Sequence, residues 1–301
     1  MLTTLNPSAQ QFLNSLNQIG DNLQRAQLEI SSGLKIRQAS DAPDSIAPLL
    51  SARAELSNTQ QSLANLGSFK TETDAGEHAL QTAVTLFDSV QTLGSQGASS
   101  TQTAAVRQTL AAQLDSSLQQ AVGLANTVVQ GRYIFSGDSD QTQPYTYNSG
   151  AASPVSAYQG TVSTRQAQSP DGTTFSVALN AQQIFDSPDP TTNVFTAIQN
   201  LSTALKANDN AAIQTAVGGL AHVGDYLNQQ LAHYGNFQNQ VAAATTLGQT
   251  LQTQQQAQIS NLQDADLTSA ILLQTQSTTQ EQAALQSRAQ TPLKTLFDYL
   301  A

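Results

Sequence analysis

The sequence predicts a mainly α-helical fold in which a small β domain is inserted into a long antiparallel rod of helices formed by the N- and C-terminal segments. Apolar residues recur in alternating steps of four and three near both ends of the chain, which is the spacing of a heptad seam. Between about residues 133 and 185 the pattern changes to short β-prone runs separated by Gly, Pro, Asp and Ser. Because helical segments flank these runs, we expect the two ends of the chain to pair with each other.

The first helical segment shows the heptad spacing most plainly, with a seam of Phe12, Leu16, Ile19, Leu23, Ala26 and Ile30. A second seam begins at Leu49. Between the two seams, residues 31–45 are expected to form an ordered linker, because Pro43 and Pro48 interrupt a helix. Asp41 in this linker is placed to cap the helix that follows.

The later elements follow from the same signals. A stretch rich in Gly, Ser and Thr, residues 94–103, is expected to end the second helix before a third one that runs to about Gly131. The sequence SPDG predicts a hairpin turn, because Pro170 suits the first corner and Gly172 can adopt a positive φ. Beyond Pro190 the longest seam contains Val223, Leu227, Gln230, Tyr234, Phe237, Val241, Ala244, Gly248 and Leu251.

These elements predict three regions. The expected division is a terminal helical assembly layer at 1–40 and 260–301, a helical rod domain at 41–130 and 196–259, and an inserted β domain at 131–195.

The composition excludes several classes of protein. The 301 residues include 11 Lys and Arg against 21 Asp and Glu, a net charge of −10, so we expect no nucleic-acid partner. The mean hydropathy is −0.27 and no window approaches the roughly 20 apolar residues of a membrane span, so membrane insertion is not expected. The N-terminus lacks the basic and apolar regions of a cleavable signal peptide.

No motif for catalysis, a cofactor or a metal is found. The three His residues lack ligand spacing, Cys is absent, and phosphate-binding or nucleophile-elbow sequences do not occur. Asp138, Asp140 and Asp171 are better explained as solvated loop acids than as calcium ligands, and Asp41 and Asp44 as helix caps. We therefore expect a protein that is not an enzyme and binds no cofactor.

The terminal seams predict self-assembly. The inner helices can bury their seams within one molecule. The terminal helices extend beyond the other helices, so their apolar faces are left uncovered, and they carry few charges. The residues expected at the assembly interface are Leu2, Leu5, Phe12, Leu16, Ile19, Leu23, Ile30, Leu267, Ile271, Leu285, Leu293, Leu296, Phe297 and Leu300.

Three segments resemble a known family. The segment SSGLKIRQASDAPD is similar to the signature of the bacterial flagellin superfamily, with matching positions Ser31, Ser32, Gly33, Ile36, Asp41 and Pro43. The segment GRYIFSG is similar to the hook-filament junction subgroup, that of the flagellar hook-associated proteins; its matching positions are Gly131, Arg132, Tyr133, Phe135 and Gly137. The ending LFDYL at 296–300 resembles the same subgroup. Two departures are Ala42, which separates Asp41 from Pro43, and Gln183, where the family usually has a glycine.

The resemblance implies a structural subunit that joins hook to filament in the bacterial flagellum. It further implies an extracellular place in the flagellum, reached through the flagellar type III apparatus without a cleaved signal peptide. The implied partners are copies of the chain itself, a hook-side junction protein, filament flagellin, and an export chaperone on the C-terminal helices from about Asp264 to Ala301.

Two other functions remain open from the sequence. One is a filament flagellin, which would form long homopolymers. The other is a secreted glycan-binding module that uses the aromatic residues of the β domain, although these are more often core residues. The residues concerned are Tyr133, Tyr145, Tyr147, Tyr158 and Phe175.

Overall fold

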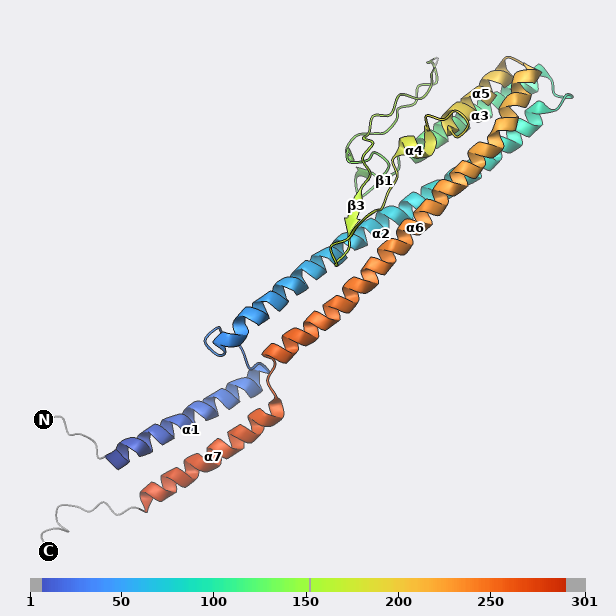
Figure 1. The fold of residues 1–301 in the computed structure, drawn as a ribbon. Coiled ribbons are helices and arrows are strands. Elements are labelled where there is room, and N and C mark those ends of the chain that lie inside the picture. Colours follow the sequence, from blue (N-terminus) through green and yellow to red (C-terminus); the bar gives the residue numbers. More distant parts are fainter. Residues whose placement is uncertain (1–6, 152, 291–301) are drawn as a thin grey trace, which may run out of the picture. The chain divides into compact units, whose positions relative to one another are not determined.

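The structure, a computed structural model, describes residues 7–151 and 153–290 (Figure 1). Its helices are α1 Pro7–Ser32, α2 Pro43–Ala98, α3 Ala104–Ala125, α4 Ala181–Phe185, α5 Val194–Lys206, α6 Asn210–Gln263 and α7 Leu267–Ala289. Its strands are β1 Val128–Val129, β2 Arg132–Tyr133, β3 Gln166–Gln168 and β4 Thr174–Ser176. The predicted fold class, a mainly helical chain with a small β region between the helices, is confirmed.

The chain divides into two compact units. The terminal unit comprises residues 1–57 and 252–301, and the central unit comprises residues 58–251. Helices α2 and α6 each contribute residues to both units. In each unit, a segment from before the β region pairs with a segment from after it.

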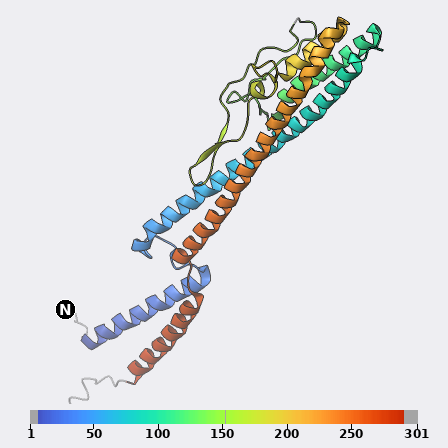
Figure 2. The same cartoon turned by 45° about the vertical axis from the view of Figure 1, so that its right-hand side comes forward.

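In the central unit, α2 and α6 pack side by side as an antiparallel pair (Figures 1 and 2). The amide of Gln91 donates to the carbonyl oxygen of Leu220 at 3.4 Å, and the amide of Gln238 donates to Asp74 at 3.0 Å. The predicted seam of α6 lies at this contact, since Val223, Leu227, Gln230, Tyr234, Val241, Ala244 and Gly248 are all buried. The heptad spacing therefore identified the buried face of α6 correctly.

The predicted break at 94–103 begins later than expected, because α2 continues to Ala98. Gly94 and Gly97 lie inside the helix, where a Cβ would meet the side chains of Leu201 and Leu205 respectively. These glycines allow neighbouring side chains to pack closely against α2, and they do not end the helix. Pro48 was also expected to interrupt a helix, yet it lies within α2 near its N-terminal end.

The β region contains less strand than the sequence predicts. Only the hairpins β1–β2 and β3–β4 form there among the described residues, and the run PYTYN contributes a single bridge between Tyr147 and Val155. Side chains replace strand partners: the Asn126 amide accepts from the Tyr145 N–H at 3.0 Å and donates to the Tyr145 carbonyl at 2.8 Å. The predicted SPDG turn is confirmed between β3 and β4, with Gly172 at φ +89°.

In the terminal unit, α1 and α7 lie side by side and antiparallel (Figure 1). The Arg288 guanidinium near the end of α7 lies 5.8 Å from the ring centroid of Phe12 near the start of α1. At the opposite end of the pair, Leu34 forms a bridge with Asp264. None of the helices in the described residues combines the length and apolarity needed to cross a bilayer.

Candidate assembly surfaces and family motifs

The predicted seam of α1 faces α7 only in part. Ala26 is fully buried, while the larger seam residues stay half-buried because a single neighbouring helix cannot enclose them. On α7 the buried positions are Ala270 and Ser277, whose small side chains allow α1 to approach closely. The half-buried seam residues are Phe12, Leu16, Ile19, Leu23 and Ile30.

The large apolar residues predicted on α7 point away from this contact. Leu267, Ile271 and Leu285 are 48%, 52% and 52% exposed. Two further exposed apolar residues, Leu13 on α1 and Leu272 on α7, were not among the predicted interface residues. These side chains are candidates for burial in a complex. We call Leu13, Leu267, Ile271, Leu272 and Leu285 the exposed apolar set.

One face of α7 also carries a shallow hollow of about 380 Å³ whose surface is almost entirely hydrocarbon. It is lined by Leu272, Thr275, Gln276, Thr279, Gln280 and Ala283. The threonines Thr275 and Thr279 donate their hydroxyls to carbonyls one turn back, which leaves their methyl groups free for packing. The remaining predicted interface residues, Leu2, Leu5, Leu293, Leu296, Phe297 and Leu300, lie outside the described residues.

The first family segment closes α1 and ties it to the α6–α7 connection. Gly33 ends α1 in the left-handed conformation, at φ +69°, with its N–H donating to Glu29 O at 2.8 Å. The Ser32 hydroxyl donates to Leu28 O at 2.6 Å. Next, the Lys35 N–H donates to Gln263 O at 2.7 Å, and the Ala265 N–H donates to Gly33 O at 2.9 Å. The two connections of the terminal unit are thus paired backbone to backbone.

The same segment corrects the predicted role of Asp41. Its carboxylate accepts the N–H groups of Arg37 at 2.9 Å and Gln38 at 3.0 Å, so it closes its own loop instead of capping α2. These backbone hydrogen bonds, helped by the Arg37 charge, lower the pKa of Asp41 below its usual value of 3.8. Ile36 is 3% exposed and anchors the loop, and Pro43 begins α2, where a proline is favoured.

The second family segment forms a tight turn followed by a buried anchor. Gln130 and Gly131 have φ +51° and +78°, which makes the β1–β2 connection a two-residue turn of type I′. Phe135 is fully buried, with its ring 6.1 Å from Tyr234 and 6.2 Å from Phe185. Gly137 has φ +66° and lies against the backbone of residues 161 and 163, where no Cβ would fit. This segment fixes the β region on the helices.

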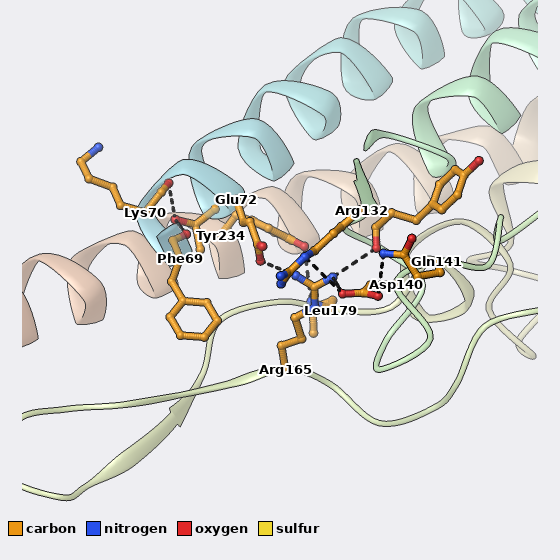
Figure 3. A network of polar contacts seen from close by, with 11 residues as sticks. Phe69, Lys70, Glu72, Arg132, Asp140, Gln141, Arg165, Leu179 and Tyr234 are labelled. Atoms are coloured by element: carbon orange, nitrogen blue, oxygen red, sulfur yellow. Dashed lines mark hydrogen bonds and ion pairs between the residues drawn. The ribbon is translucent and has the colours of Figure 1, made fainter. Parts of the chain in front are cut away.

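A polar network holds the same region against α2 (Figure 3). The Arg165 guanidinium contacts Glu72 at 2.5 Å and Asp140 at 3.7 Å, and donates to Tyr133 O at 3.4 Å. Asp140 also lies 3.6 Å from Arg132, a residue of the family segment. Sequence reasoning missed Arg165 and Glu72, because 93 positions separate them and neither lies in a motif.

Gln183 replaces the family glycine without strain. It is the third residue of α4 and forms a capping box with Asn180: Asn180 Oδ1 accepts the Gln183 N–H at 2.8 Å, and Gln183 Oε1 accepts the Asn180 N–H at 3.3 Å. The helical start therefore has no need of glycine there.

The titratable groups of the described residues have local structural partners. They contain no group of three or more His, Asp or Glu side chains able to hold a metal ion. Asp171 has a lowered pKa because its carboxylate accepts the hydroxyl and the N–H of Thr173. Burial raises the pKa of Tyr158 to about 12, and Tyr145 packs against it with ring centroids 5.5 Å apart. Tyr145 is a fully buried core residue, Tyr147 and Tyr158 are partly buried against the same core, and Phe175 is partly buried against a smaller apolar cluster.

The N-terminal part of the chain is similar to a known family. Residues 4–140 match the bacterial flagellin N-terminal helical region, which confirms the resemblance drawn from the first family segment. No curated protein matches the chain in sequence.

Comparison with solved structures identifies the fold. A Vibrio parahaemolyticus protein assigned as a flagellar hook-associated protein is 19% identical with a TM-score of 0.65, covering 74% of this chain and 100% of its own. FlgL of Bacillus cereus is 24% identical with a TM-score of 0.55, covering 72% and 100%. The flagellar junction protein FlgL of Legionella pneumophila is 14% identical with a TM-score of 0.57, covering 72% and 100%. The chain has the fold of these flagellar proteins.

Proposed function

We propose that the chain is a structural subunit of the bacterial flagellum that joins hook to filament. Two findings support this: the match to the flagellin N-terminal helical region and the fold shared with flagellar hook-associated proteins. Its work is mechanical and not catalytic. The observation that carries the proposal is the pairing of α1 with α7, which leaves the seam of α1 half-buried and the apolar residues of α7 exposed.

The exposed apolar set is the surface through which we propose that the subunits assemble. Leu267, Ile271 and Leu285 are each about half exposed, and burying a side chain of this size stabilises a complex by about 1.5–3 kcal/mol when burial is complete. Residues 1–40 and 260–301 would form the inner assembly layer, with 41–130 and 196–259 as the rod and 131–195 as the β domain.

The proposed partners are other copies of the chain, a hook-side junction protein and filament flagellin. The chain would leave the cell through the flagellar type III apparatus and act outside it. An export chaperone would bind the C-terminal helices from about Asp264, covering the same apolar residues until assembly. Copurification of a chaperone with the full chain, and its loss when residues 264–301 are deleted, would test this part.

The experiment for the main proposal uses the host strain with this gene deleted. The full chain should restore filaments attached to hooks, seen by electron microscopy. A chain with Ile271→Gln and Leu285→Gln, expressed until immunoblotting finds as much of it in the culture medium as of the full chain, should give bare hooks. A matched control is Val162→Gln in the central unit, where the valine is 73% exposed and no assembly surface is proposed. Filaments restored equally by the α7 variant would refute the role of this surface.

Filament flagellin is the second candidate, because the matching family model is that of the flagellin N-terminal region. Purified flagellin would form long filaments in precipitating salt, which strengthens apolar association. A junction subunit should remain monomeric or form short rings. Negative-stain microscopy of the purified chain separates the two candidates.

A further inference from the structure

The terminal unit contains a second surface, formed by charged side chains instead of apolar ones. A hollow of about 360 Å³ lies between the second half of α1 and the loop that follows it. Charges of both signs converge there: Asp21, Arg25, Glu29, Lys35, Arg37 and Asp41.

The basic residues of this hollow differ from the others that the structure describes. In the central unit, Lys70, Arg132, Arg165 and Lys206 form ion pairs, and Arg107 donates to Gly97 O, Ser99 O and Asn208. In the terminal unit, Arg53 donates to Gln263 and Arg288 lies over Phe12.

By contrast, Arg25, Lys35 and Arg37 form no ion pair within 4 Å with any described residue. Asp21 and Glu29 lie one turn on either side of Arg25, yet neither pairs with it. The Asp41 carboxylate is already occupied by the N–H groups of Arg37 and Gln38. The hollow therefore presents three basic side chains that make no charge-assisted hydrogen bond with any described residue.

We infer that this hollow receives carboxylate side chains of a second copy of the chain, and that Arg25, Lys35 and Arg37 form the ionic contact between neighbouring subunits. The inference rests on the proposed function, which places identical subunits side by side. Contacts between different faces of identical subunits generate rings and helical tubes, so the hollow of one copy would meet another face of the next.

Charge complementarity identifies the occupant. The six charged residues of the hollow cancel, so the net charge of −10 lies entirely on the rest of the chain. Outside the hollow, 18 acidic residues face 8 basic ones, so a carboxylate is the commoner charged group that another copy can offer to Arg25, Lys35 and Arg37. The contact would also fix how the apolar surfaces of neighbouring subunits align, because a shifted subunit would bring like charges together.

The test uses cross-linking of the full chain bound to hooks isolated from cells that lack this gene. Light and ¹⁵N-labelled protein are mixed, added to the hooks, and treated with a carbodiimide, which joins an amine to a carboxylate already in contact. We expect Lys35 to give cross-linked peptides that combine light and heavy chains. Lys70 and Lys206 are the internal controls, because they lie 2.7 Å and 2.6 Å from Asp74 and Asp115 of the same chain and should give same-isotope links.

A variant pair supplies the second readout. Arg25→Gln with Lys35→Gln should lower the protein bound to hooks about tenfold, while α1 and α7 stay folded by circular dichroism. Lys70→Gln with Lys206→Gln removes the same charge from the central unit and should bind as the unaltered chain does.

The outcomes distinguish this inference from the function on which it rests. Same-isotope links alone at Lys35, links from Lys35 to hook protein, or unchanged binding of the Arg25 and Lys35 variant would overturn the ionic contact and leave the junction role standing. If the unaltered chain does not bind hooks at all, both proposals fail.

Discussion

Gly76 on α2 lies directly against the ring of Tyr234 on α6, so close that any Cβ at position 76 would overlap the ring. Tyr234 is 1% exposed, its hydroxyl accepts the N–H of Leu179 at 3.3 Å, and its ring meets Phe135 edge-on. One tyrosine thus joins both long helices of the central unit to the β region, and the glycine opposite makes room for it.

Gly76→Ala should therefore destabilise the central unit by about 1–3 kcal/mol, because the added methyl group forces the Tyr234 ring out of a packed site. Chemical denaturation of the full chain measures the change. The matched control is Gly67→Ala in the same helix, where the added Cβ would meet nothing within 4 Å. That substitution should stabilise by about 0.5–1 kcal/mol, since alanine favours a helix more than glycine does. Equal effects at the two positions would contradict the packing argument.

Gly33→Ala should destabilise the terminal unit by about 1 kcal/mol, because φ +69° is costly for any residue with a Cβ. Thermal unfolding followed by circular dichroism measures it. Asparagine tolerates this conformation better, so Gly33→Asn should cost less than Gly33→Ala. Gly20→Ala within α1, where a Cβ would meet nothing within 4 Å, should not destabilise. A loss at position 20 as large as that at position 33 would argue against the role of the left-handed turn.

Arg165→Met should destabilise the central unit by about 2 kcal/mol, because it leaves the Glu72 carboxylate, only 14% exposed, without its partner. Adding Glu72→Gln to this variant should recover part of the loss, and a double-mutant cycle measures the coupling between the two residues. Lys70→Met breaks an ion pair whose side chains are 66% and 43% exposed, so it should cost less than about 0.5 kcal/mol. Absence of coupling between positions 72 and 165 would show that the pair does not hold the β region.

Acid should open the loop that follows α1. The pKa of Asp41 is lowered in the folded chain, so its contribution to stability is present above the unfolded value of 3.8 and is lost as pH falls through the lower folded value. The amide resonances of Arg37 and Gln38, which donate to this carboxylate, should shift together in an NMR titration below about pH 4. Asp41→Asn should abolish that shared transition. Its persistence in the variant would assign the transition to another carboxyl group.

The sequence predicted the parts of this fold that follow from periodicity and turn chemistry. The α6 seam at Val223, Leu227 and Tyr234 is buried because a heptad spacing places these side chains on one face of any helix. The SPDG hairpin formed because Gly172 alone in that turn adopts a positive φ at little cost. The family segments were recognisable for a related reason, since several of their positions have strict backbone or packing requirements.

Other features depended on neighbours that the local sequence does not reveal. Gly94 and Gly97 look like helix-breaking residues, and only the positions of Leu201 and Leu205 explain why α2 continues through them. Asp41 has the residue type of a helix cap, but the backbone of its own loop binds it first. Arg165 and Glu72 carry no local signal at all.

The sequence by itself determined that this protein is a pair of helical ends around a small β region, because spacing along the chain fixes which face of each helix is apolar. Only the tertiary structure decided which apolar faces are buried within the chain and which stay exposed. The small side chains of Ala270 and Ser277 turn one face of α7 toward α1, and Leu267, Ile271 and Leu285 are left outside. A helix with apolar groups on two faces can bury only one against a single neighbour, and the choice depends on how closely the two backbones can approach.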